Sequence, residues 1–178
     1  MFKFFEEKKS ITSTELAVEL WEFCLDISGQ FQGEVMSSLE NSGLELNSEE
    51  KKTAILEVPK LNLWIISKTL PSDKVTLEKL HHLYASAMEK YLKQIGSPKT
   101  QLEIIDDLIQ TYKIYYNNWN DKSGGEQTVL ATEILQQLLN NGKFDKKFMS
   151  FFATFIINEY LLKAMQATLD LRNNYEII

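Results

Sequence analysis

Residues Leu16–Ile27, with the sequence LAVELWEFCLDI, decide the fold class of this chain. Every position in the stretch is apolar except Glu19, Glu22 and Asp26, and Glu15 stands just before it. The four acids are spaced 4-3-4, so on an α-helix they fall within an arc of roughly 60°. We therefore predict a helix that is buried over most of its circumference and carries one acidic strip, formed by Glu15, Glu19, Glu22 and Asp26.

The rest of the chain continues the helical pattern. Its 178 residues include only 7 Gly and 3 Pro, and 44% are hydrophobic, which is enough for a core without disulfides or metals. Apolar stripes at helical spacing alternate with short breaks, and the alternation typical of strands is scarce. We predict one all-α domain over residues 1–178, an irregular helical bundle of about six or seven helices, with residues 1–11 as a flexible arm.

Local signals place three of these helices. Thr12 and Glu15 match a capping box, which predicts the start of the first helix. Pro59 is expected to divide or kink a helix over residues 49–70, and periodicity alone does not exclude a strand at 61–66. The last helix, over residues 145–172, is apolar nearly all round, and we expect it to be the central helix of the bundle or an oligomer interface.

Negative charge is concentrated in the N-terminal third. The net charge is −6, and residues 1–59 contribute −7 through 12 acids and 5 lysines. This sign disfavours nucleic acid as a partner and leaves a basic protein partner open. No apolar run reaches the roughly 20 residues of a membrane span and no secretory signal is visible, so we expect a cytoplasmic protein without a transmembrane segment.

The acidic strip is the first candidate site. We interpret Glu15, Glu19, Glu22 and Asp26 as an interaction surface for a basic or mixed protein partner. Three alternatives stay open: a solvated edge of a mostly buried helix, a set of acids paired with lysines of another helix, and a metal or acid–base site.

An interhelical pocket is the second candidate site, because aromatic residues recur at helical spacing near the middle of the chain and two polar residues interrupt the last helix. The candidate lining is Tyr112, Tyr116, Trp119, Asn158 and Glu159. The alternative is an aromatic core, with a structural hydrogen bond for Asn158 and a surface pair of Glu159 with Lys163.

A metal site is the third candidate. Glu78 and His81 form a Glu-x-x-His pair, the spacing that places two ligands on one face in di-iron helical bundles. Such a centre needs two of these pairs, and His82 is the only other histidine, so one chain cannot supply it alone. The single cysteine, Cys24, is expected to be a small buried hydrophobe.

The sequence alone does not establish a function. It contains none of the common nucleotide, phosphate, zinc-protease or nucleophile motifs, so no cofactor is expected. We rank a non-catalytic protein–protein interaction protein first and a binder of a small apolar ligand in an aromatic-lined pocket second. A metal-dependent helical enzyme is third, and a homo-oligomer stays open.

Overall fold

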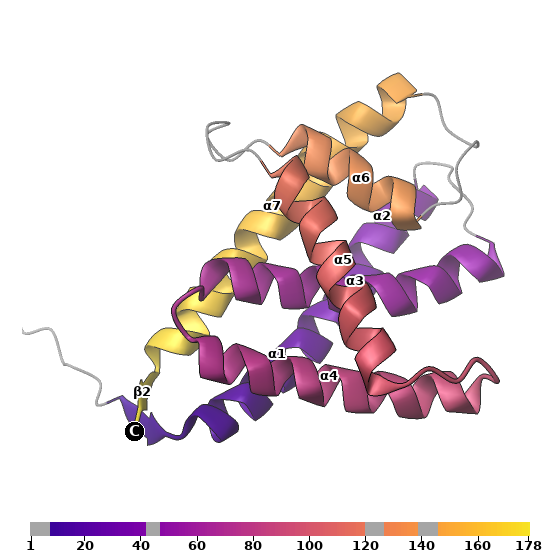
Figure 1. The fold of residues 1–178 in the computed structure, drawn as a ribbon. Coiled ribbons are helices and arrows are strands. Elements are labelled where there is room, and N and C mark those ends of the chain that lie inside the picture. Colours follow the sequence, from indigo (N-terminus) through magenta and orange to yellow (C-terminus); the bar gives the residue numbers. More distant parts are fainter. Residues whose placement is uncertain (1–7, 42–46, 120–126, 139–145) are drawn as a thin grey trace, which may run out of the picture.

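The computed structural model describes residues 8–41, 47–119, 127–138 and 146–178, and it confirms the predicted all-α bundle (Figure 1). The elements in chain order are β1 (Lys9–Ile11), α1 (Ser13–Phe31), the π-helix η1 (Gln32–Met36), α2 (Ser37–Asn41), α3 (Ser48–Thr69), α4 (Lys74–Gln94), α5 (Gln101–Asn118), α6 (Thr128–Leu138), α7 (Lys146–Asn173) and β2 (Tyr175–Ile177).

Reciprocal capping boxes begin α1, α3 and α5. At α1, the Thr12 hydroxyl accepts from the Glu15 amide at 3.2 Å, and the Glu15 carboxylate accepts from the Thr12 amide at 2.8 Å. These bonds satisfy donors that have no partner within the helix, and the backbone bond lowers the pKa of Glu15. The same arrangement begins α3 at Asn47 and α5 at Thr100.

α3 is the central helix of the bundle. Its nine consecutive residues Val58–Ile66 are all buried, because α1, α5, α6 and α7 all pack against it. Two hydrophobic clusters meet at α3, one with α6 and α7 and the other with α1 and α4. The helix runs unbroken through Pro59, so the expected division does not occur, and residues 61–66 are helical rather than a strand.

α7 is long, but it is not the centre of the bundle. It contacts α3 and α6 through one face, while Phe155 is 71% exposed and Leu162 is 52% exposed on another. The prediction that this helix is central is therefore wrong, because α3 occupies that place. Among the described residues, no helix is both long and apolar enough to cross a membrane.

The two ends of the described chain are joined. β1 and β2 pair in parallel, with Lys9 opposite Tyr175 and Ile11 opposite Ile177. Ile11 is 2% exposed, so this part of the segment expected as an arm lies packed against the domain (Figure 1). The guanidinium of Arg172 strengthens this end of the molecule, because it binds Asp73 at 2.6 Å and the Tyr175 carbonyl at 3.0 Å.

Candidate functional site

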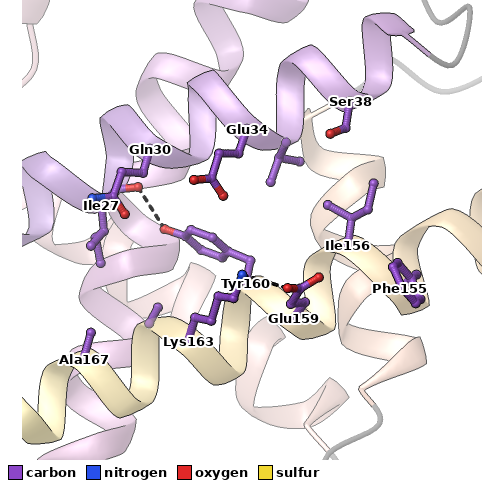
Figure 2. Close-up of a pocket in the computed structure, with 12 residues that line it drawn as sticks. Ile27, Gln30, Glu34, Ser38, Phe155, Ile156, Glu159, Tyr160, Lys163 and Ala167 are labelled. Carbon is purple, nitrogen blue, oxygen red and sulfur yellow. Dashed lines mark hydrogen bonds and ion pairs between the residues drawn. The ribbon is translucent and has the colours of Figure 1, made fainter.

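A groove of about 490 Å³ lies between the α1–η1–α2 segment and α7 (Figure 2). Its volume is in the range of binding pockets in proteins, and it is located between helices, where ligand sites of helical bundles usually form. The lining residues are Ile27, Gln30, Glu34, Val35, Ser38, Phe155, Ile156, Glu159, Tyr160, Lys163, Ala164 and Ala167.

The π-helix η1 forms one wall of the groove. α1 passes into η1 at Gln32 without a break, and Met36 leads directly into α2. A π-turn is wider than an α-turn and is often found at functional sites. Figure 2 shows the Glu34 side chain extending from this wall toward α7. The wall is not wholly polar, because Val35 also lines the groove.

α7 forms the opposite wall through residues that share one face. Ile156, Tyr160, Lys163 and Ala167 follow one another at intervals of three or four residues, which places them in one row on the helix. The small side chains of Ala164 and Ala167 leave space beside the ring of Tyr160. The groove is thus open beside Ala164 and Ala167, and the ring of Tyr160 closes its inner side.

A buried hydrogen-bond network lies behind the groove and joins three helices. The Tyr160 hydroxyl is 2.5 Å from Asn62 Oδ1 and 3.2 Å from the Ile27 carbonyl. Asn62 Nδ2 donates to Ser28 Oγ at 2.9 Å, and Ser28 Oγ donates to the Cys24 carbonyl at 2.6 Å. Burial raises the pKa of Tyr160, which therefore stays a neutral donor. Tyr160, Asn62 and Ser28 were not predicted as a group, because nothing local in the sequence links them.

The rim of the groove has more negative than positive groups. Lys163 pairs with Glu159 at 2.7 Å, and Glu34 adds a second carboxylate across the groove (Figure 2). The hydrogen bond from Lys163 to Glu159, together with the charges of Glu159 and Glu34, raises the pKa of Lys163. With the amine engaged by one acid, the groove offers a net negative charge to a ligand.

The acidic strip leads into this groove. Gln30 and Glu34 follow Asp26 at successive intervals of four residues, so they continue the line of the strip along α1 into η1. Glu22 and Asp26 are exposed and take part in no ion pair within the described part of the chain.

The other two acids of the strip have local roles. Glu15 caps α1, and Glu19 lies partly buried beside Tyr175. Burial, followed by the charge of Glu19, raises the pKa of Tyr175. Of the four strip acids, Glu22 and Asp26 are therefore the two that are exposed and make no ion pair with the residues that the structure describes.

Of the residues predicted to line one aromatic pocket, Tyr116 and Trp119 lie beside each other under the Lys68 amine, 5.4 and 5.2 Å from their ring centroids, whereas Asn158 and Glu159 have separate surroundings. Glu159 lines the groove, whereas Asn158 is buried and accepts a hydrogen bond from the Gln127 amide at 3.0 Å, directly before α6. Trp119 packs against Trp64 with ring centroids 5.6 Å apart, and Tyr116 is 64% exposed. The alternative roles proposed for Asn158 and Glu159, a structural hydrogen bond and a pair with Lys163, are the ones observed.

The two predicted metal ligands differ in their surroundings. Glu78 is exposed, while His81 is largely buried and its Nε2 lies 3.1 Å from the Tyr112 hydroxyl and 3.3 Å from Ser67 Oγ. Among the described residues, no three or more His, Cys, Asp or Glu side chains gather as metal ligands would. His81 and Tyr112, assigned by the sequence to two different sites, thus share one polar cluster with Ser67.

His81 makes the stability of the protein depend on pH. Burial, with a smaller effect of the charge on His82, lowers the pKa of His81 in the folded state. The folded state favours the neutral imidazole, and the resulting stability is fully present above the unfolded-state pKa near 6.5. It is lost as the pH falls through that pKa toward the lower folded-state pKa. We expect urea unfolding to show a loss of at most ~1.4 kcal/mol per pH unit from this residue. His81→Gln should remove this pH dependence of stability, whereas His82→Gln, the control at an exposed site, should retain it. Equal pH profiles for wild type and His81→Gln would contradict this assignment.

Binding is the chemistry that the groove supports directly. Its lining offers two carboxylates, one amine, one side-chain amide, one aliphatic hydroxyl, one phenol and several apolar surfaces. Cys24 lies behind it, buried, and burial raises the pKa of its thiol to about 12, so it is protonated and unreactive at neutral pH. Comparison with protein families, with curated proteins and with solved structures finds no match to this chain.

Proposed function

We propose that this protein is a non-catalytic interaction protein whose groove binds a short segment of a partner protein. The segment carries one large apolar side chain that enters the groove, with Lys or Arg beside it. The observation that carries this proposal is the continuity between an exposed acidic surface and an apolar groove, formed by Glu22, Asp26, Gln30 and Glu34 along one line.

The apolar part of the groove supports the anchor side chain. Ile27, Val35, Ile156 and Ala164 present hydrocarbon to a cavity that is open to one side. Burying an apolar side chain there is favourable by about 25 cal/mol per Å² of apolar surface removed from water. Tyr160 is held in place by its hydroxyl contacts and by its edge-on packing against Phe31, with ring centroids 4.7 Å apart. The groove wall is thus largely formed before a partner arrives, which limits the entropy cost of binding.

The charge around the groove supports a basic partner. Glu34 lies at the groove, and Glu22 and Asp26 are exposed along the approach on α1. Charges of one sign around a binding surface steer an oppositely charged partner and set its specificity. Binding is therefore expected to weaken as the salt concentration rises, since exposed charges are screened within about 10 Å at 0.1 M ionic strength.

Selection of peptides from a random displayed library tests the proposal. We expect the selected peptides to combine a large apolar residue with neighbouring Lys or Arg and to bind more weakly at 0.5 M than at 0.05 M salt. Ala167→Trp, which fills the groove, should weaken binding by about tenfold or more. Gln166→Trp is the matched control, because Gln166 is exposed on the same helix and does not line the groove.

Two results would contradict the proposal. One is a set of selected peptides without basic residues whose binding ignores salt. The other is equal affinity of the selected peptides for wild type and Ala167→Trp, which would place binding on another surface.

A small apolar ligand is the second candidate occupant, favoured by the groove volume of about 490 Å³ and by the phenol of Tyr160 at its wall. Native mass spectrometry separates it from the first. A retained mass of a few hundred daltons, present in wild type and absent in Ala167→Trp, would support this candidate instead of the peptide.

A further inference from the structure

α5 carries a second exposed apolar feature, away from the groove. Leu102, Ile109 and Tyr116 are 69%, 42% and 64% exposed and recur at intervals of seven residues. Two turns of helix separate consecutive members, so they form one stripe about 21 Å long. We call these three residues the α5 stripe.

Leu102 and Ile109 of the α5 stripe lie on the side of the helix that faces away from the core, and the exposed ring of Tyr116 has the Lys68 amine of α3 5.4 Å from its centroid. Ile104, Leu108 and Tyr115 of the same helix are buried against the bundle, and α5 lies in front of α3 in Figure 1. Single exposed apolar residues are common on protein surfaces, whereas an aligned row of large ones typically marks an interaction surface.

Opposite charges flank the α5 stripe at matching positions. Asp106 follows Leu102 by four residues, and Lys113 follows Ile109 by four residues. Both are exposed, and neither takes part in an ion pair among the residues that the structure describes. They are seven residues apart on one helix, about 10 Å along its axis, too far apart to pair with each other.

The geometry points to a second copy of this chain as the occupant of this face, with the two α5 helices antiparallel. A two-fold axis at Ile109 places Leu102 of each chain at the level of Tyr116 of the other and brings the two Ile109 side chains together. The same axis, to within half a residue, places Asp106 of each chain at the level of Lys113 of the other. One surface is thus complementary to itself in the register of its apolar residues and in charge, as an isologous dimer interface must be.

The charges also specify the orientation. In a parallel pair, Asp106 and Lys113 of one chain share their levels with the same residues of the other chain, which lie on the opposite side of the seam, so neither charge meets an opposite one. Charges flanking an apolar seam set the orientation of helix pairs in this way. The similar row on α7, Phe155, Leu162 and Leu169, lacks this property, because the residues at the equivalent flanking positions are Glu159 and Gln166.

Charge exchange tests the dimer in the full-length protein. Sedimentation equilibrium of wild type should show a concentration-dependent dimer. Asp106→Lys alone and Lys113→Asp alone should each weaken it by about tenfold or more, because each variant places like charges opposite one another. An equal mixture of these two variants should dimerise again, since the mixed pair has opposite charges at both positions. A monomeric wild type, or variants that dimerise as wild type does, would overturn the proposal.

Cysteine cross-linking gives a second, independent test. Ile109→Cys places a thiol at the proposed axis, and oxidation should link two chains. Ile114→Cys is the matched control, because Ile114 is 40% exposed on the same helix but points about 140° away from the stripe. The natural Cys24 is buried and should not react. Equal cross-linking of both variants would overturn the assignment to this face.

Discussion

Leu63→Ala is expected to lower the free energy of unfolding by about 2–5 kcal/mol, measured by urea denaturation. Leu63 is fully buried in the middle of α3, where its side chain lies in the cluster shared with α1 and α4. Removing three carbons there loses transfer free energy and leaves a cavity, since packed helices on several sides limit collapse. The loss is large compared with the 5–15 kcal/mol by which domains of this size are stable.

Two controls distinguish this expectation from a general effect of leucine or isoleucine truncation. Ile55→Ala lies on the same helix at a site 42% exposed, and Leu162→Ala lies on α7 at a site 52% exposed. Each should change stability by less than about 1 kcal/mol. If Leu162→Ala cost as much as Leu63→Ala, α7 rather than α3 would be the central helix.

Asn62→Ala is expected to lower the free energy of unfolding by about 1–3 kcal/mol. Asn62 is fully buried, and its amide joins Ser28 of α1 to Tyr160 of α7. Its removal takes one hydrogen-bond partner from each of the Ser28 and Tyr160 hydroxyls. The Ser28 hydroxyl keeps its contact with the Cys24 carbonyl, and the Tyr160 hydroxyl keeps its contact with the Ile27 carbonyl. Asn117→Ala, at an exposed site on α5, should have almost no effect.

A double-mutant cycle isolates the network from the cavity that Asn62→Ala creates. Asn62→Ala combined with Tyr160→Phe should cost less than the sum of the single changes, with a coupling of about 0.5–3 kcal/mol. Strict additivity would mean that the two side chains do not share a hydrogen bond in solution.

The parts of the fold that the sequence predicted are those fixed by short-range chemistry. The start of α1 follows from Thr12 and Glu15, because a capping box needs only residues three apart. The apolar residues of Leu16–Ile27 correctly placed that helix against a core, where Leu16, Leu20 and Cys24 are fully buried. The helix is not buried over most of its circumference as predicted, because Val18 and Leu25 are 41% and 47% exposed.

The central position of α3 was not predictable from the sequence, because the polar residues Lys60 and Asn62 interrupt its apolar pattern. Lys60 is buried only because Glu57 and Asp107 bind its amine at 2.8 and 2.6 Å, and Asp107 comes from another helix. Such partners are brought together by tertiary packing, so hydrophobic periodicity does not register them.

The groove was only partly predictable for the same reason. Glu159 was identified as a polar interruption of the last helix, but the opposite wall depends on η1, and no propensity rule marks a π-turn. Tyr112 was assigned to a pocket, yet its hydroxyl meets His81 from α4. The pairing of β1 with β2 joins opposite ends of the chain and leaves no local signal.

Mapping a selected peptide onto the protein by two-dimensional NMR tests the central claim most directly. Titration of labelled protein should shift the backbone amide signals of Glu34, Val35, Lys163 and Ala167, which line the groove, together with Glu22 and Asp26 on its approach. Ala167→Trp should remove these shifts while leaving the rest of the spectrum folded. Shifts confined to α4 or α5, with the groove signals unchanged, would contradict the assignment of this groove as the binding site.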